Sequence, residues 1–169
     1  FIPAHAVRTF LWNVFADHYL EAVKARAYNT DNDFPRDEQM AAWSTLHTCL
    51  KTALKLLAPI CPFITEAIWR AAYSGTSIHC EVFPEPTEEW VSEYGAITPS
   101  LVEFNSAVWK YKKAKNMALN AQIKTVYGPE VLKPLERDLK IMHRIEHFFF
   151  GEPAQKENLE NVGSVYLAA

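Results

Sequence analysis

Apolar residues recur every three to four positions along the first half of the chain, which is the spacing of amphipathic helices. A long helix is predicted over residues 5–28, and the turn-forming string NTDND at residues 29–33 ends it. Its wide apolar stripe consists of Val7, Phe10, Leu11, Val14, Phe15 and Leu20. A second helix is predicted over residues 36–58. Its predicted buried stripe consists of Trp43, Leu46, Leu50, Ala53, Leu54 and Leu57.

Two prolines separate this second helix from a third. Pro59 ends the second helix, because proline cannot continue the hydrogen-bond ladder, and Pro62 suits the first turn of the next one. The third helix is predicted over residues 62–73, with a stop at Ser74-Gly75. We expect its apolar face to pack in a tight corner against the second helix. The residues of that face are Phe63, Ile64, Ala67 and Ile68.

The pattern changes in the second half of the chain. Residues 78–83 alternate weakly and are predicted to be a short strand or an extended segment. Residues 84–100 form a polar, proline-rich connector that is expected to hold a domain boundary. Helices are then predicted over 101–117 and 130–143, and strands over 121–127, 147–150 and 161–167. The fold class is therefore mainly α, with a helical bundle in residues 1–83 and a small α/β unit in residues 101–169.

The composition of the chain indicates the compartment in which the protein is expected to work. The chain has 169 residues, 49% of them hydrophobic, but no apolar run approaches the ~20 residues of a membrane span. It begins without an initiator Met, a basic leader or a cleavage site, which is typical of an excised, non-secreted fragment. Cys49, Cys61 and Cys80 fit no metal spacing and indicate a reducing, cytoplasmic compartment. Buried free thiols are expected at Cys49 and Cys61.

Charge is unevenly distributed. The net charge is −3, yet residues 29–100 carry −6 and residues 101–145 carry +5. Lys110, Lys112, Lys113 and Lys115 lie within six residues, with Trp109 and Tyr111 among them. Lysines neutralise phosphates and aromatic rings stack on exposed bases, so this segment favours nucleic-acid binding on one face. A solvated helix with Trp109 turned to the core is the alternative.

Residues for catalysis are not evident. The chain has only five glycines and lacks a glycine-rich phosphate loop. His143 and His147 occur in HRIEH, which is not the zinc-binding HExxH pattern. No serine or cysteine lies in a nucleophile motif. The sequence therefore predicts a binding module that performs no chemistry of its own.

Three stretches resemble one family. The string LLAPICPFITEAIW, followed by IHCEVFPEP, is similar to the anticodon-binding region of the valyl-tRNA synthetases, and more distantly to the isoleucyl, leucyl and methionyl enzymes. The stretch FLWNVFADHYLEAVKARAY resembles the family's aromatic helix. The stretch VWKYKKAKNMALNAQIK resembles the helix-to-strand passage of archaeal-type valyl enzymes. The three matches occur in the family's order and cover most of residues 5–125.

The resemblance implies a function and a set of partners. The family's HIGH and KMSKS signatures do not occur here, so ATP- and magnesium-dependent attachment of valine would belong to a catalytic domain outside this chain, and no cofactor is expected within it. The partners would be valine tRNA and the catalytic and editing domains of the same cytoplasmic enzyme, with no membrane. The family's bundle has one more helix before the first one seen here. Candidate tRNA-binding residues are Arg8, Lys24, Arg26, Arg70, Lys110, Lys112, Lys113, Lys115 and Lys124.

Two alternatives stay open. The first is the same module from an isoleucyl- or leucyl-tRNA synthetase, and the second is a helical protein-interaction domain without an RNA role. Phosphate-driven tRNA binding weakens steeply as salt rises, whereas a protein-interaction domain binds no tRNA even at low salt. We also predict that replacing Lys112 and Lys113 together by Glu weakens tRNA binding with little loss of stability.

Overall fold

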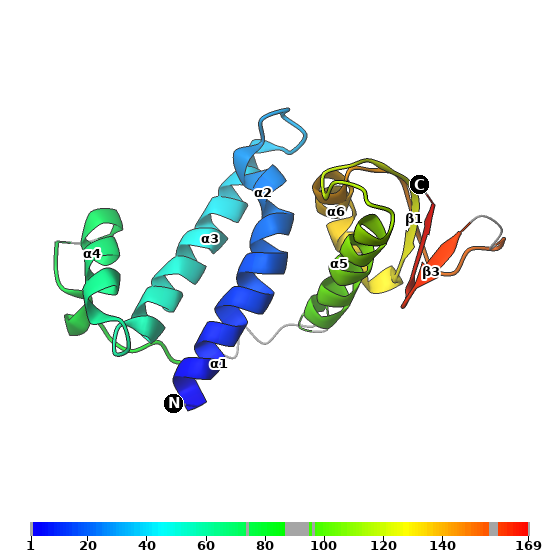
Figure 1. Cartoon of the computed structure of the whole chain (residues 1–169). Coiled ribbons are helices and arrows are strands. Elements are labelled where there is room, and N and C mark those ends of the chain that lie inside the picture. The colour runs from blue at the N-terminus through cyan, green and yellow to red at the C-terminus, as the bar shows by residue number, and fades with distance from the viewer. Residues whose placement is uncertain (1, 74, 87–94, 96, 156–158, 169) are drawn as a thin grey trace. The chain divides into compact units, whose positions relative to one another are not determined.

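The computed structural model describes all residues except 1, 74, 87–94, 96, 156–158 and 169. Contacts divide the chain into two compact units. The first comprises residues 1–17 and 26–91, and the second comprises residues 18–25 and 92–169. The predicted boundary falls mostly on residues 87–94, which lie outside the described residues. A helical first part followed by a small α/β part confirms the predicted fold class (Figure 1).

The first helix is longer than predicted and is not uniformly α-helical. It consists of α1 (Ile2–Phe10), a π-helical stretch η1 (Leu11–Leu20) and α2 (Glu21–Tyr28). The predicted apolar stripe is only partly covered, because no residue of α1 is fully buried. An open, mainly apolar cleft of about 670 Å³ lies between this helix and α3 (Arg36–Leu57), lined by Phe10, Leu11 and Thr48 among others.

Side chains from α3 complete the end of α2. The last carbonyls of a helix have no partner within it, so they need donors from elsewhere. Gln39 Nε2 donates to the Ala27 carbonyl at 3.0 Å, and Trp43 Nε1 donates to the same oxygen at 2.8 Å. Asn29, with φ of 47°, exchanges two hydrogen bonds with the backbone of Phe34 and shapes the connecting loop.

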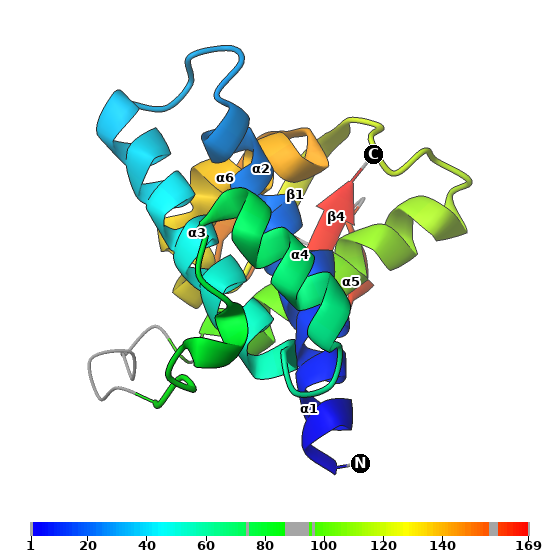
Figure 2. The same cartoon turned by 90° about the vertical axis from the view of Figure 1, so that its left-hand side faces the viewer.

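The two-proline corner forms as predicted, but the third helix presents a different face. The helix α4 (Pro62–Ala72) begins at Pro62 and packs on the last turns of α3 (Figure 2). Its buried residues are Thr65 and Trp69, whereas Phe63 is 90% exposed. The predicted apolar face was therefore wrong. Trp69 decides the orientation, because its large ring fills the small cluster formed with Leu54 and Ile78.

Three further predictions for this unit were wrong in part. Residues 78–80 form a 3₁₀ turn, η2 (Ile78–Cys80), in place of the predicted strand or extended segment, and the backbone becomes extended only at Glu81. In the predicted α3 stripe Leu54 is buried as expected, but Trp43 and Leu50 are exposed, and the other buried residues of α3 are Gln39 and Ala42. Cys61 is exposed and Cys49 is half-buried, and burial raises the pKa of the Cys49 thiol.

The second unit is a four-stranded sheet with two helices on one face (Figure 1). The helix α5 (Ile97–Ala114) precedes the strand β1 (Ile123–Gly128). The chain then continues through a 3₁₀ segment, η5 (Glu130–Leu135), and the helix α6 (Glu136–His143). These two elements form the crossover to β2 (Ile145–Phe150), which runs parallel to β1. The predicted strand 161–167 is a hairpin of β3 (Glu160–Val162) and β4 (Val165–Ala168), turning at Gly163 with φ of 65°. The strand order is β2-β1-β4-β3, with β4 antiparallel to β1.

A series of hydrogen bonds between buried polar side chains links α5 and α6 in this unit. His143 Nε2 lies 2.8 Å from Asn105 Oδ1, and Asn105 Nδ2 lies 3.2 Å from His18 Nδ1. The Trp109 ring packs near both imidazoles, with centroid distances of 5.3 Å to His18 and 5.9 Å to His143. Burial, reinforced by the charge of Lys112, lowers the pKa of His143 to about 3. His143 is therefore neutral, and it serves the packing of the unit.

Candidate nucleic-acid interface

One predicted contact residue, Lys112, lies in the protein interior. Its exposed fraction is 0%, and Nζ donates to the carbonyls of Leu119 at 2.6 Å and His143 at 2.9 Å. Burial lowers the pKa of Lys112, with a further effect from Arg144. The residue shares the core-facing side of α5 with Val108 and Tyr111. Lys112 cannot reach a phosphate without unfolding this junction, so its predicted surface role was wrong. The expectation that its replacement by Glu costs little stability was wrong for the same reason.

Its neighbours Lys110 and Lys113 are on the opposite side of α5. They are three residues apart, which places them on one face of a helix. Both are exposed, and neither has an ion pair within the described residues. Arg8 in α1 and Lys124 in β1 are likewise exposed and unpaired among the described side chains. These four cations are the predicted residues that are free to meet phosphate.

The other predicted cations are already engaged. Lys24 pairs with Glu21, and Lys115 pairs with Glu160, which raises the pKa of Lys115. Arg26 lies 3.5 Å from Glu38 and 5.2 Å from the Phe34 ring centroid. Arg70 is bonded to Glu66 and donates to the Gly75 carbonyl at 2.8 Å. Phosphate binding by these residues would have to displace an existing partner.

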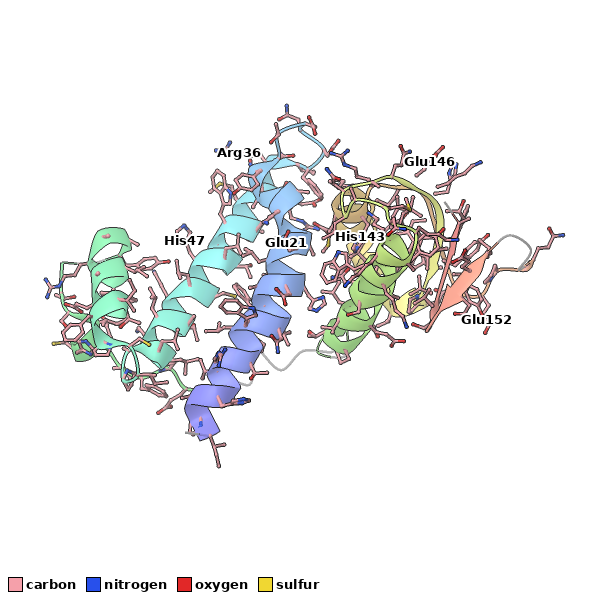
Figure 3. The ribbon with its side chains drawn as sticks, viewed as in Figure 1. Glu21, Arg36, His47, His143, Glu146 and Glu152 are labelled. Atoms are coloured by element: carbon pink, nitrogen blue, oxygen red, sulfur yellow. The ribbon has the colours of Figure 1, made fainter. Side chains whose placement is uncertain are left out.

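A second group of cations and rings was missed by the sequence reasoning. It comprises Arg36, Met40, Trp43, His47 and Lys51 of α3, together with Tyr73, and we call it the α3 ledge. All five α3 side chains are exposed, and Tyr73 is half-buried. The three- and four-residue spacing of the five α3 positions is visible in the sequence, but the predicted core stripe includes Trp43. Figure 3 shows Arg36 and His47 projecting from the side of α3 opposite α1 and α2.

Contacts hold the rings of the α3 ledge in place. The Trp43 indole is fixed by its bond to Ala27, and Arg36 lies 5.9 Å from the Trp43 ring centroid. His47 Nδ1 lies 3.1 Å from the Tyr73 hydroxyl, and Lys51 Nζ is 4.9 Å from the Tyr73 ring centroid. Each ring therefore has a cation beside it, an arrangement that cation–π attraction favours.

The residues that the structure describes were compared with the requirements of a metal centre and of a membrane span. In the part of the chain that the structure describes, His, Cys, Asp and Glu side chains do not gather in a group of three that could hold a metal ion. Likewise, the described helices include none with the length and apolarity to cross a membrane.

Most of the chain is similar in sequence to known proteins. Residues 2–127 match the family model described as the anticodon-binding domain of tRNA ligase. The chain is 45% identical over 166 residues to the valine–tRNA ligase of Pyrobaculum aerophilum, which covers 98% of this chain and 20% of that protein. It is 37% identical over 173 residues to the same enzyme of Aeropyrum pernix, covering 99% of this chain and 21% of that protein.

A bacterial relative extends this comparison. The valine–tRNA ligase of Rickettsia felis is 33% identical over 162 residues, which cover 90% of this chain and 18% of that protein. The chain thus spans about a fifth of the length of these relatives. Three-quarters of its residues lie within the matched family model, from α1 through most of β1. The chain belongs to the family of anticodon-binding domains of tRNA ligases.

Proposed function

We propose that this chain is the tRNA-recognition module of a valine–tRNA ligase. In the proposed mechanism it binds the anticodon end of valine tRNA and thereby directs the acceptor end to a catalytic domain outside this chain. That domain would attach valine in a reaction that uses ATP and magnesium. Each residue assigned a role here takes part in binding, and none takes part in the chemical step. The family membership and the names of the relatives support the proposal.

The observation that carries the proposal is the exposed pair on α5. Lys110 and Lys113 extend from one face of a helix whose opposite side is anchored in the core. An unpaired ammonium that is already exposed loses little on meeting a phosphate, and it releases counterions when it does. We assign these two residues to the tRNA backbone, together with Lys124 of β1. Lys112 is excluded from this role by its burial.

Charge reversal tests the α5 contact. Lys110→Glu and Lys113→Glu are each expected to weaken tRNA binding and to reduce the salt dependence of log K by about one unit per lost phosphate contact. Lys133→Glu is the matched control, because Lys133 is exposed in the same unit but lies outside α5. Filter binding between about 50 and 200 mM salt measures both quantities. Equal affinities for all three variants and the unmodified chain would remove α5 from the interface.

Valine specificity is tested separately. The relatives reported above are valine–tRNA ligases, so we expect valine tRNA to bind more tightly than isoleucine tRNA. Equal affinity for the two tRNAs would leave a general tRNA-binding module and would contradict the valine assignment. We place the parent enzyme in the cytoplasm, where the free state of Cys49, Cys61 and Cys80 would persist. Its catalytic and editing domains are the proposed partners within the same protein.

A further inference from the structure

The sheet of the second unit carries helices on one face only. The helices α5 and α6 pack on the face that buries Val126, Phe148 and Leu167 (Figure 1). Successive side chains of a strand point to opposite faces, so the neighbours of these three residues project from the other side. We call that side the outer face. Its residues, all exposed or half-buried, are Thr125, Tyr127, His147, Phe149, Asn161 and Tyr166.

Aromatic rings form a row across the outer face. In the strand pairing Tyr127 lies opposite Phe149 on one side and opposite Tyr166 on the other. The Tyr127 and Phe149 rings stack with centroids 5.1 Å apart, and His147 stacks on Phe149 at 6.5 Å. Phe149 is 46% exposed, and the side chain of His147 is 55% exposed. The rings are therefore ordered by each other and still accessible within this unit.

The carboxylates of the four strands are already engaged. There are two, Glu146 in β2 and Glu160 in β3. Glu146 accepts from Gln122 Nε2 at 3.4 Å and lies 3.4 Å from His147 Nε2. Glu160 pairs with Lys115 of α5. Neither carboxylate is left without a partner to oppose an anion that approaches the sheet.

Two cations lie at the start of the strands that carry the stacked rings. Lys124 is the second residue of β1, and Arg144 immediately precedes β2. The Ile123 N–H donates to the Arg144 carbonyl at 3.0 Å, so the two strand starts are adjacent. Both side chains are exposed, and neither forms an ion pair among the described residues. Positive charge without a counter-charge thus borders the aromatic row.

This combination fits a single strand of RNA. Unpaired bases stack on aromatic side chains, and each base brings a phosphate that a nearby cation neutralises. A duplex keeps its bases stacked on one another and offers the rings no free base face along its length. A protein partner would need carboxylates placed against Lys124 and Arg144, whereas an RNA strand carries its anions at every step. The Thr125 hydroxyl and the Asn161 amide on the same face can bond to the 2′-hydroxyls that distinguish RNA from DNA.

We propose that the outer face of the sheet is a binding site for single-stranded RNA. One base stacks on the exposed part of the Phe149 ring and a neighbouring base stacks on His147, while Arg144 and Lys124 contact the phosphates. This goes beyond the proposed function, which uses cations alone and involves no aromatic ring. The helix α5, with Lys110 and Lys113, lies on the opposite face of the sheet, so the two surfaces are separate.

Two RNA probes test the stacking. The probes are an unstructured RNA single strand and the blunt duplex that it forms with its complement, both measured with the full chain by fluorescence anisotropy. Phe149→Ala is expected to weaken single-strand binding roughly 5- to 150-fold and to leave duplex binding unchanged. Phe63→Ala is the control, because Phe63 is an exposed phenylalanine outside the sheet and should leave both affinities unchanged.

The salt dependence tests the phosphate contact. Lys124 is common to both proposed surfaces, so the test uses Arg144. Asparagine tolerates the φ of 53° at this position, and Arg144→Asn should therefore remove the charge without straining the backbone. The slope of log K against log salt should become about 0.7 less steep, the value for one phosphate of a single strand. Lys133→Gln is the control, because Lys133 is an exposed cation outside the sheet.

Further variants separate binding from folding. Phe149→Ala removes a ring that stacks on Tyr127, so it is checked by thermal unfolding, and Phe149→Leu replaces it if it is unfolded. Phe149→Trp retains a stacking ring and should keep most of the affinity. Unchanged single-strand affinity in Phe149→Ala and Arg144→Asn, with weakened tRNA binding in Lys110→Glu, overturns the outer-face site and leaves the proposed function standing. Equal weakening toward single strand and duplex overturns base stacking, and so does a lack of single-strand binding by the unmodified chain at low salt.

Discussion

The buried imidazole of His143 makes the stability of the second unit depend on pH, and the size of this effect can be calculated. The side chain is buried, and its pKa is lowered from an ordinary value of 6.5 to about 3. In the unfolded chain the imidazole takes up a proton below pH 6.5, whereas the folded unit resists protonation down to about pH 3. The folded state therefore loses stability as pH falls from 6.5 toward 3. Between pH 8 and pH 5 the expected loss is about 2 kcal/mol.

Urea unfolding at pH 8 and pH 5 measures this loss. Tryptophan fluorescence is a suitable probe, because the Trp109 ring lies 5.9 Å from that of His143. His143→Gln keeps an N–H donor for Asn105 but does not titrate, so its free energy of unfolding should fall by about 2 kcal/mol less over this range. His147→Gln is the control, because the side chain of His147 is 55% exposed. Identical pH dependence in the unmodified protein and in His143→Gln would refute the reasoning, as would an NMR titration of His143 near pH 6.5.

Two further predictions concern packing in the same unit. Lys112→Glu should destabilise the unit by about 3 kcal/mol or more, because it points a buried carboxylate at two carbonyl oxygens. The free energy of unfolding of the control, Lys113→Glu, should stay within about 0.5 kcal/mol of that of the unmodified protein. Urea unfolding of the two variants measures the difference. A Cβ on Gly128 would lie 2.9 Å from the Phe148 ring, so Gly128→Ala should cost about 1–3 kcal/mol. Gly75→Ala meets no atom within 4 Å, and equal melting temperatures for the two alanine variants would contradict this account.

Secondary structure was predictable where local signals were strong. Pro59 and Pro62 fixed the corner between α3 and α4, because their effect on the backbone does not depend on tertiary contacts. The division of the predicted strand 161–167 into β3 and β4 was harder to predict. A single glycine, Gly163, is a weak turn signal in the sequence, and the hairpin is evident only from the pairing of β3 with β4 and of β4 with β1.

Helix faces were less predictable than helix positions. In α4, apolar spacing favoured Phe63 and Ile64, yet the helix buries Trp69, whose ring fills the cluster with Leu54 and Ile78. Thr65 is buried beside it at little cost, because its hydroxyl donates to the Cys61 and Pro62 carbonyls. In α5, four clustered lysines could not all lie on one exposed face, but the sequence did not identify Lys112 as the buried one. The carbonyls that accept its protons come from residues 119 and 143, which only the tertiary structure brings together.

The carboxylate of Glu66 has a consequence for how the first unit assembles. One oxygen binds Arg70 on the next turn of α4, and the other accepts from the Ser77 hydroxyl and the Ile78 backbone, each at 2.9 Å. Arg70 in turn holds the Gly75 carbonyl. These bonds require Glu66 and Arg70 to be one helical turn apart, so the conformation of the segment that leaves α4 depends on α4 being helical. Order in residues 75–78 is therefore a cooperative product of α4, and a loss of helix there would release the exit segment at the same moment.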